Sequence, residues 1–356
     1  MKNYFMLYAN CIIVKGISRG IITDLQHLRY KLIPLLLADI LEVMSKEELS
    51  IDEVKQQFNN EYNKGIDLFL ENLIEEGYGI KTDDISFFPK LPLDYDYPAK
   101  ISNAIVDLNK LSTYHVKNIG VDLNILGVKA VEIRFFDPIS LEKINSILTS
   151  FELTGIRSIE LLIQYSTFWT VEKIHQIFIN QRRVQRIILA SAPEDKEVQS
   201  EFLDIFWITK AVKSSNCCGL VGFRYFNPNM KHFTESQHHN TCLNRKISID
   251  TQGRIKNCPS MQQSFGHIND TTLEEVIQNP AFTKVWNIKK DEIEKCKGCE
   301  FRHICTDCRA YLENPEDVYA APLKCGYNPE TCEWEDWSTN PLKEKAIEYY
   351  QLQSTF

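Results

Sequence analysis

Residues 296–308 read CKGCEFRHICTDC and place four thiols, those of Cys296, Cys299, Cys305 and Cys308, within thirteen positions. Two residues separate the cysteines of each pair, so one tight turn can direct both sulfurs at the same point. This geometry suits a metal ion or an iron–sulfur cluster better than a disulfide. The stretch therefore predicts that the C-terminal part of the chain folds around an inorganic centre.

Further cysteines flank this stretch, at Cys242 and Cys258 before it and at Cys325 and Cys332 after it. The first residues, MKNYFMLYANCIIVKG, lack the small-residue cleavage site of a signal peptide. No run of about eighteen apolar residues occurs in the sequence, so no membrane span is predicted. We therefore expect a cytoplasmic protein, in which clustered, reduced thiols bind metal more often than they pair with each other.

Length and charge narrow the class further. The chain has 356 residues, enough for two or three domains that each bury a core. Its net charge of -8 disfavours a nucleic-acid-binding surface, which is normally basic. We find no phosphate-binding GxxxxGK motif and no GxGxxG motif, so nothing predicts that this chain binds ATP.

Residues 1–90 are predicted to form a winged helix-turn-helix domain. The turn KGISR separates two apolar runs, and Ser50 followed by Glu53 is a capping box at the start of a helix. Pro34 is tolerated only in the first turn of the helix that we expect around it. The predicted elements are strands at 4–14 and 20–25, helices at 30–44, 50–58 and 60–76, and an extended pair at 80–88.

This order of strands, three short helices and a wing resembles the recognition element of RiPP systems, which make ribosomally synthesised and post-translationally modified peptides. The resemblance implies that the leader segment of a precursor peptide adds as an extra strand to an open sheet edge. The alternative is a winged helix that binds DNA or only caps the next domain. The negative net charge of the chain favours peptide binding over DNA binding.

After a proline-rich linker at 89–100, residues 101–213 alternate between strand and helix patterns. Such alternation predicts an α/β fold, with a parallel sheet or partial (β/α) barrel that is covered by helices. The predicted strands are rich in Ile, Val and Leu, as buried parallel strands are. They lie at 104–108, 130–136, 158–165, 186–190 and 206–212.

A barrel joined to a cysteine-rich extension resembles the radical S-adenosylmethionine (radical SAM) enzymes that carry a SPASM domain. In that family a CxxxCxxC loop after the first barrel strand holds the cluster that binds S-adenosylmethionine. Here the corresponding stretch after Leu108, NKLSTYHVKNIG, contains no cysteine. His115 is the only candidate ligand in it, and one imidazole does not replace three thiolates. We expect His115 to face solvent on a helix, and we expect no S-adenosylmethionine site.

Residues 214–356 resemble a SPASM domain in the order of their cysteines. KISID and RIKNC read as two strands around the turn TQG, so a hairpin brings Cys242 and Cys258 together. The segments CLNRKISID, GRIKNCPSM and CEFRHICTDCRAY are most similar in sequence to the SPASM-domain peptide maturases of grasp-with-SPASM systems. That resemblance implies two partners, a precursor peptide and an ATP-grasp peptide ligase.

The SPASM resemblance also implies two [4Fe–4S] clusters. One would be held by Cys296, Cys299, Cys305 and Cys325. The other would be held by Cys242, Cys258 and Cys308 with a fourth ligand, for which we choose Cys218, with Cys217, His238 and His239 as rivals. The alternative is two structural Zn²⁺ sites of four thiolates each. Cys332 has no partner in the pattern and is expected to be a free thiol.

Three functions fit these features. The first is a maturation factor that binds a precursor leader and presents the peptide to an ATP-grasp ligase. The second is an active radical SAM enzyme that uses the SPASM clusters for electron transfer. The third is a redox-sensing winged-helix regulator. We favour the first, because the N-terminal domain suits peptide recognition while the barrel lacks its cluster loop.

Overall fold

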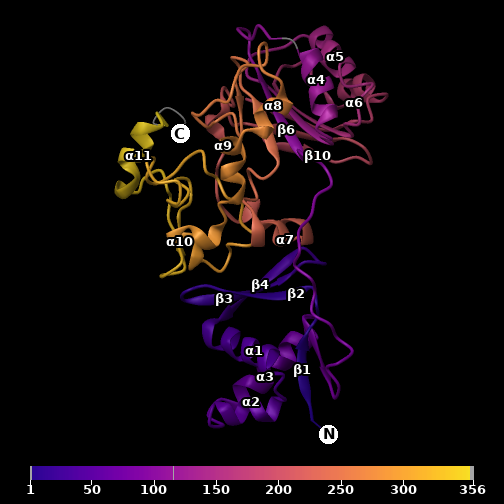
Figure 1. The fold of residues 1–356 in the computed structure, drawn as a ribbon. Helices are drawn as coiled ribbons and strands as arrows, with labels where there is room; N and C mark the ends of the chain where they lie inside the picture. The colour runs from indigo at the N-terminus through magenta and orange to yellow at the C-terminus, as the bar shows by residue number, and fades with distance from the viewer. Residues whose placement is uncertain (1, 115, 353–356) are drawn as a thin grey trace.

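The computed structural model of the chain describes residues 2–114 and 116–352, arranged from the N-terminal unit (residues 2–90) through a cysteine-rich lobe (residues 214–352) to a large sheet (Figure 1). His115, for which we expected a solvent-facing position, lies outside the described residues. Within the described residues, no helix is long and apolar enough to cross a membrane.

The N-terminal unit combines a three-stranded antiparallel sheet, in the order β2-β3-β4, with three helices and an antiparallel β1-β5 pair. Its core is a cluster of aliphatic side chains, among which Ile22, Ile40 and Leu70 are fully buried. The elements are β1 (Tyr4–Leu7), β2 (Cys11–Lys15), β3 (Arg19–Asp24), β4 (Arg29–Pro34), α1 (Leu35–Glu47), α2 (Ile51–Gln57), α3 (Asn63–Glu75) and β5 (Gly79–Thr82).

Two local predictions for this unit have different outcomes. The capping box is present, because the Ser50 side chain accepts from the Glu53 amide and the Glu53 carboxylate accepts from the Ser50 amide. The helix predicted from residue 30 is wrong in its first turn, since residues 29–34 form β4. A residue before proline avoids the helical region, so the helix begins only after Pro34.

The sheet of the second region has eight strands in the order β10-β11-β9-β8-β7-β6-β12-β13. All neighbours pair in parallel except the two outer strands, β10 and β13. The predicted mixed α/β fold with a mostly parallel sheet is therefore confirmed. The elements are β6 (Asn103–Leu108), α4 (Val116–Ile125), β7 (Ala130–Phe135), α5 (Leu141–Thr149), β8 (Ser158–Gln164), α6 (Val171–Phe178), β9 (Val184–Ala190), β10 (Lys196–Val198), β11 (Asp204–Ile208), β12 (Lys246–Ile249) and β13 (Ile255–Lys256).

Alternate residues of these strands face different surroundings. Val106, Val131 and Ile133 belong to the large apolar core that the strands share with helices α4, α5 and α6. Asp107 and Arg134 sit at the intervening positions and are also buried. A polar pair on the other face of an otherwise aliphatic sheet must find partners. Asp107 and Arg134 pair with each other, and Cys218 of the cysteine-rich lobe accepts a further hydrogen bond from Arg134.

The cysteine-rich lobe contributes two strands to this sheet, which the sequence did not predict. The hairpin around TQG forms β12 and β13 as expected, but β12 also pairs in parallel with β6, with Ile247 opposite Ala104. The rest of the lobe is mostly loops. Its other elements are α7 (Met230–His238), α8 (Leu273–Gln278), α9 (Pro280–Thr283), α10 (Glu294–Lys297), β14 (Tyr327–Asn328), β15 (Glu333–Trp334) and α11 (Glu344–Tyr349), with 3₁₀ turns at Ser215–Cys217, Phe223–Tyr225, Lys284–Asn287, Lys290–Glu292 and Pro341–Lys343.

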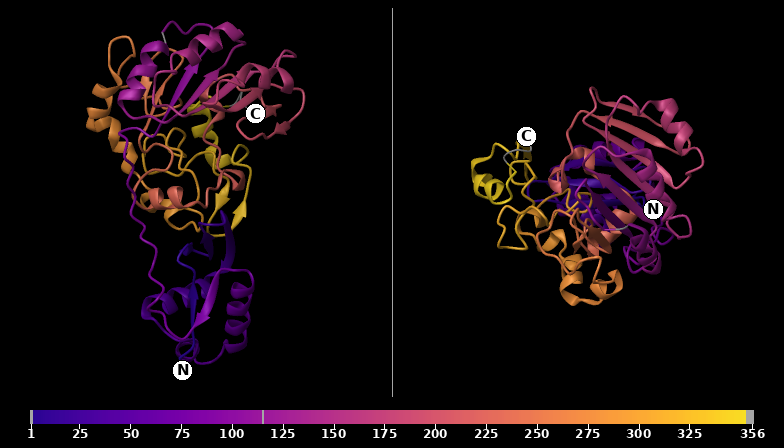
Figure 2. Two further views of the ribbon diagram at one scale, coloured as in Figure 1. Left: turned by 90° about the vertical axis from the view of Figure 1, so that its right-hand side faces the viewer. Right: turned by 90° about the horizontal axis from the view of Figure 1, so that it is seen from above.

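Residues 83–102 connect the N-terminal unit to the sheet without forming a helix or strand (Figure 2). On the way they contact helix α7. The Tyr95 hydroxyl donates to the Glu235 carboxylate at 3.1 Å, and His238 Nε2 lies 3.1 Å from the Leu93 carbonyl oxygen. The linker is therefore held against the lobe along part of its length.

The β2–β3 turn of the N-terminal unit docks on the lobe. The Ile17 amide donates to the Gly298 carbonyl at 2.8 Å, and a Cβ at Gly298 would collide with Ile17. Arg19 Nε donates to Glu300 at 2.5 Å, and the Tyr327 hydroxyl also donates to this fully buried carboxylate. Arg302 donates in return to the Lys15 carbonyl at 2.6 Å. The N-terminal unit therefore docks directly on residues 296–308, the stretch that carries four of the cysteines.

We predict that Arg19→Met destabilises this contact by about 3 kcal/mol, because the buried Glu300 carboxylate loses its cationic partner. Urea unfolding of the full chain should show a lower midpoint, and limited proteolysis should cut the linker at 83–102 faster. The matched control is Lys31→Met, which removes a pair with the exposed Glu76 and should change stability by less than about 0.5 kcal/mol. Equal effects of the two substitutions would contradict the role assigned to Arg19.

Candidate metal centres

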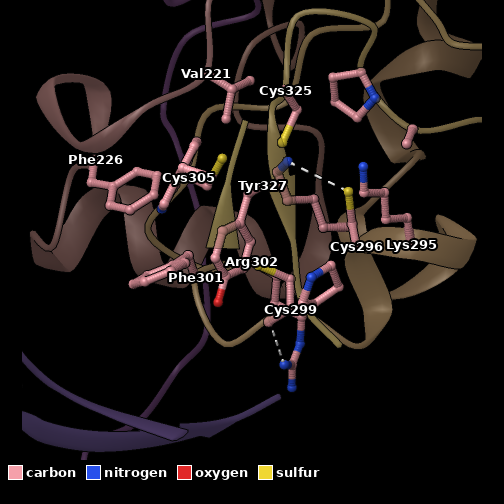
Figure 3. A pocket seen from close by; sticks show the side chains of 15 residues that line it. Val221, Phe226, Lys295, Cys296, Cys299, Phe301, Arg302, Cys305, Cys325 and Tyr327 are labelled. Atoms are coloured by element: carbon pink, nitrogen blue, oxygen red, sulfur yellow. Dashed lines mark hydrogen bonds between the residues drawn. The ribbon is translucent and has the colours of Figure 1, made fainter. Parts of the chain in front are cut away.

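Four predicted ligands line one cavity of the lobe. Cys296, Cys299, Cys305 and Cys325, here called the first cysteine group, surround about 400 Å³ of space free of protein atoms, part of it open to solvent. Figure 3 shows the sulfurs of Cys296, Cys305 and Cys325 directed toward this shared space. Cys332 is not among the residues that line the cavity.

The local fold explains why these sulfurs face one another. Cys296 lies in the short helix α10, and the Cys299 amide donates to the Cys296 carbonyl at 2.9 Å, which closes the turn expected of the CxxC pair. A second turn is closed where the Cys325 amide donates to the Pro322 carbonyl at 3.2 Å. Aromatic side chains, including Phe226, Phe301 and Tyr327, line the remainder of the cavity.

A buried lysine supplies positive charge to the first group. Lys290 Nζ lies 4.0 Å from Cys296 Sγ, and its side chain is only 6% exposed. Burial alone would lower the pKa of Lys290, but the neighbouring Cys296 and Cys305 sulfurs raise it above its usual range. Burial raises the pKa of the Cys305 thiol to about 12. Without a metal the Cys305 thiol stays protonated, and metal binding must displace its proton.

The structure also brings Cys218, Cys242, Cys258 and Cys308 together, here called the second cysteine group. Burial raises the pKa of Cys258 to about 12, and the nearby sulfurs of Cys242, Cys218 and Cys308 add to that shift. The β12–β13 hairpin accounts for the approach of Cys242 to Cys258, as expected. The glycine at position 219 lets the neighbouring Cys218 come close to Cys308, because a Cβ on residue 219 would lie 2.9 Å from Cys308 Sγ.

Basic side chains contact the second group from the sheet. Arg134 Nη1 donates to Cys218 Sγ at 2.9 Å, while its Nε and Nη2 donate to the two Asp107 oxygens at 2.6 and 2.8 Å. Lys246 Nζ donates to Cys242 Sγ at 3.6 Å. Burial raises the pKa of Asp107 to about 6 while Arg134 opposes this shift, so the ion pair is charged at neutral pH.

Sequence reasoning missed Arg134, Asp107 and Lys246. The available signal was a charged residue at an inward position of an aliphatic strand, in AIVDL and in AVEIRF. Of the rival fourth ligands, Cys217 Sγ donates to the Ala211 carbonyl at 3.6 Å. His239 Nδ1 lies 3.2 Å from the Asn287 side-chain oxygen, and His238 contacts the linker. These contacts are all with groups outside the second cysteine group.

The donor set fits iron–sulfur clusters. Within the described part of the chain, no three Cys, His, Asp or Glu side chains meet closely enough to hold a single metal ion. A Zn²⁺ site needs four sulfurs at about 2.3 Å from one point, whereas a [4Fe–4S] cluster is held by four thiolates spread around its body. The four thiols of the first group, which line one cavity, fit an iron–sulfur cluster.

Comparison with known proteins supports this assignment for part of the chain. Residues 241–300 match the family model of SPASM, an iron–sulfur cluster-binding domain, and this stretch includes Cys242, Cys258, Cys296 and Cys299. The lobe is therefore similar to an iron–sulfur domain over these residues. No curated protein matches the sequence.

Three solved structures are similar to the chain at low sequence identity. Streptococcus suis SuiB bound to S-adenosylmethionine is 12% identical, with 89% of this chain and 98% of SuiB covered and a TM-score of 0.34. A second structure of S. suis SuiB is 10% identical, with the same coverage and a TM-score of 0.33. The heterocyclase TruD is 13% identical, with 38% of this chain and 22% of TruD covered and a TM-score of 0.20.

We predict that the double substitution Cys299→Ala and Cys305→Ala removes one of two iron centres, because a cluster does not persist on two of its four thiolates. Iron and sulfide analysis after anaerobic purification should show about half of the wild-type content. Cys332→Ala is the matched control and should retain all of it. Full iron content in the double variant, or zinc in place of iron in the wild type, would contradict the assignment.

Proposed function

We propose that this chain is a maturation factor for a ribosomally synthesised peptide, which binds the precursor leader through residues 1–90 and acts with an ATP-grasp peptide ligase. The observation that carries the proposal is the gathering of eight thiols into two groups of four, in a lobe that matches SPASM over residues 241–300. The N-terminal unit docks on that same lobe.

In this proposal each cysteine group holds a [4Fe–4S] cluster. Bound clusters supply one-electron redox chemistry, and they cross-link segments that are far apart in the sequence. The protein contributes the thiolates and buried cations beside them, Lys290 at the first group and Arg134 and Lys246 at the second. The two groups lie in a lobe with few regular elements, so the clusters would also stabilise its loops.

A groove in the N-terminal unit supports peptide binding. It encloses about 2080 Å³ of space free of protein atoms, part of it open to solvent, between β1, β2, the end of α1 and the linker at 85–93. β2 is an outer strand of its sheet, so its backbone is available to an added strand. Tyr8 in the groove and Phe87 at its rim are exposed and offer apolar contact area.

The end of the barrel-like sheet supports a role without radical initiation. Residues 109–115 contain no cysteine, and Ser112 Oγ of this loop donates to the Thr251 carbonyl at 2.7 Å. Val212 packs with Phe136 and with Ala190, the last residue of β9, and Gln164 of β8 donates to the Val212 carbonyl at 3.0 Å. The loop after β6 therefore offers no thiolate to a cluster.

We expect the reconstituted protein, with reductant and S-adenosylmethionine, to form no 5′-deoxyadenosine above a control without enzyme. Chromatography of the quenched reaction checks this expectation. A yield above that control, lost in a variant of either cysteine group, would favour an active radical enzyme and overturn the proposal for this region.

The proposed partnership is tested with the precursor peptide and ATP-grasp ligase that grasp-with-SPASM systems encode next to the maturase. Titration calorimetry should show binding of the precursor to the full chain, and gel filtration should show a complex with the ligase. Absence of both would overturn the proposal.

Within that titration, Tyr8→Ala should weaken precursor binding about tenfold, since an aromatic contact in the groove is lost. Tyr62→Ala is the matched control, because Tyr62 is similarly exposed and lies outside the groove. An unchanged dissociation constant for Tyr8→Ala would place the leader elsewhere on the N-terminal unit.

A further inference from the structure

A buried ion pair links the parallel sheet to the second cysteine group. Asp107 is the penultimate residue of β6, and Arg134 occupies the position opposite it on β7. Their side chains are 2% and 3% exposed. A buried ion pair stabilises a fold little compared with apolar residues of the same volume, so its presence calls for another role.

The geometry of the guanidinium indicates that role. Two of its nitrogens, Nε and Nη2, are held by the two Asp107 oxygens, which leaves Nη1 directed at Cys218 Sγ at 2.9 Å. Because two nitrogens of the planar fork are held, the directions of the Nη1–H bonds are fixed as well. A cationic donor aimed at a sulfur favours the thiolate, which is the form that binds iron.

The same contacts separate Cys218 from its neighbour. Cys217 packs beside the apolar cluster of Phe136 and Val212, whereas Cys218 contacts Arg134. Lys324 Nζ donates to the Cys218 carbonyl at 2.8 Å and to the Asn216 carbonyl at 2.6 Å, which holds the backbone in place. Only one of two adjacent cysteines is therefore presented to the second group.

The two groups also differ in the charge that surrounds them. The first has the Lys290 ammonium 4.0 Å from one sulfur. The second has Arg134 at 2.9 Å and Lys246 at 3.6 Å from two different sulfurs. The carboxylates of Asp107 and Glu132 lie 2.6 and 3.8 Å from Arg134 Nε, whereas Nη1 is the guanidinium nitrogen that contacts Cys218, so the positive end is nearer to the sulfur. Hydrogen bonds to sulfur and nearby positive charge favour the reduced, more negative state of a cluster.

We propose that Arg134, oriented by Asp107, is a positioning residue that presents Cys218 as the fourth ligand of the second centre and raises the reduction potential of that centre. The proposal rests on the proposed function, in that the second group holds an iron–sulfur cluster. It makes the second centre the preferred acceptor when a single electron enters the protein.

Redox titration of the anaerobic full-length protein, followed by electron paramagnetic resonance, tests this. Arg134→Met should lower one of the two midpoint potentials by about 59 mV, which is a tenfold change in the equilibrium constant of a one-electron couple. Arg134→Lys should recover part of the shift. The matched control is Arg186→Met on β9, whose partner Glu160 lies outside both cysteine groups, and it should leave both potentials unchanged. Unchanged potentials in an Arg134→Met protein with full iron would overturn the proposal.

Iron content decides the ligand assignment independently. Cys218→Ala should lose iron from one centre, whereas Cys217→Ala should keep both, and the reverse result would overturn the proposal. If Arg134→Met itself loses iron, Arg134→Lys should restore it, and failure of this rescue would count against the assignment. Wild-type protein without iron would overturn the proposed function together with this inference. Two intact centres that do not respond to Arg134 would overturn the inference alone.

Discussion

The structure depends on the gathering of free thiols at buried and partly buried positions. Eight cysteines from five separate stretches of the chain are drawn into two groups, where burial raises the pKa of Cys258 and of Cys305 to about 12. Apolar packing alone gives no reason for sulfurs to gather in this way. Thiolates bound to an inorganic centre do, because the bonds to the centre offset both the burial and the loss of chain entropy.

This constraint extends beyond the lobe. Glu300 stands in the sequence between Cys299 and Phe301, which both line the first cavity, and it is also the residue on which Arg19 of the N-terminal unit docks. On the other side, Arg134 of the central sheet contacts Cys218 of the second group. Each neighbouring region therefore places one arginine against a cysteine-bearing segment, so the two groups connect all three parts of the molecule.

The sequence predicted these features unevenly, for physical reasons. Strands such as 104–108 and 130–136 were placed to within a few residues, because buried parallel strands carry long aliphatic runs. The helix expected from residue 30 began late, since the local effect of Pro34 outweighed the apolar periodicity. Periodicity identified β12 as a strand but gave no information about its partner β6, which lies more than a hundred residues earlier. Similarly, the sequence showed the charged residues in AVEIRF, but it did not show that Arg134 contacts the sulfur of Cys218.

The pairing of β12 with β6 has a consequence for how the chain can be divided. A fragment that stops at residue 213 would keep five parallel strands but expose the backbone groups of β6 along a bare edge. Exposed edges of that kind recruit strands from other molecules, so the isolated fragment would tend to aggregate. Although the compositions of the two regions differ sharply, they share one sheet, so we expect that neither folds stably as an independent module.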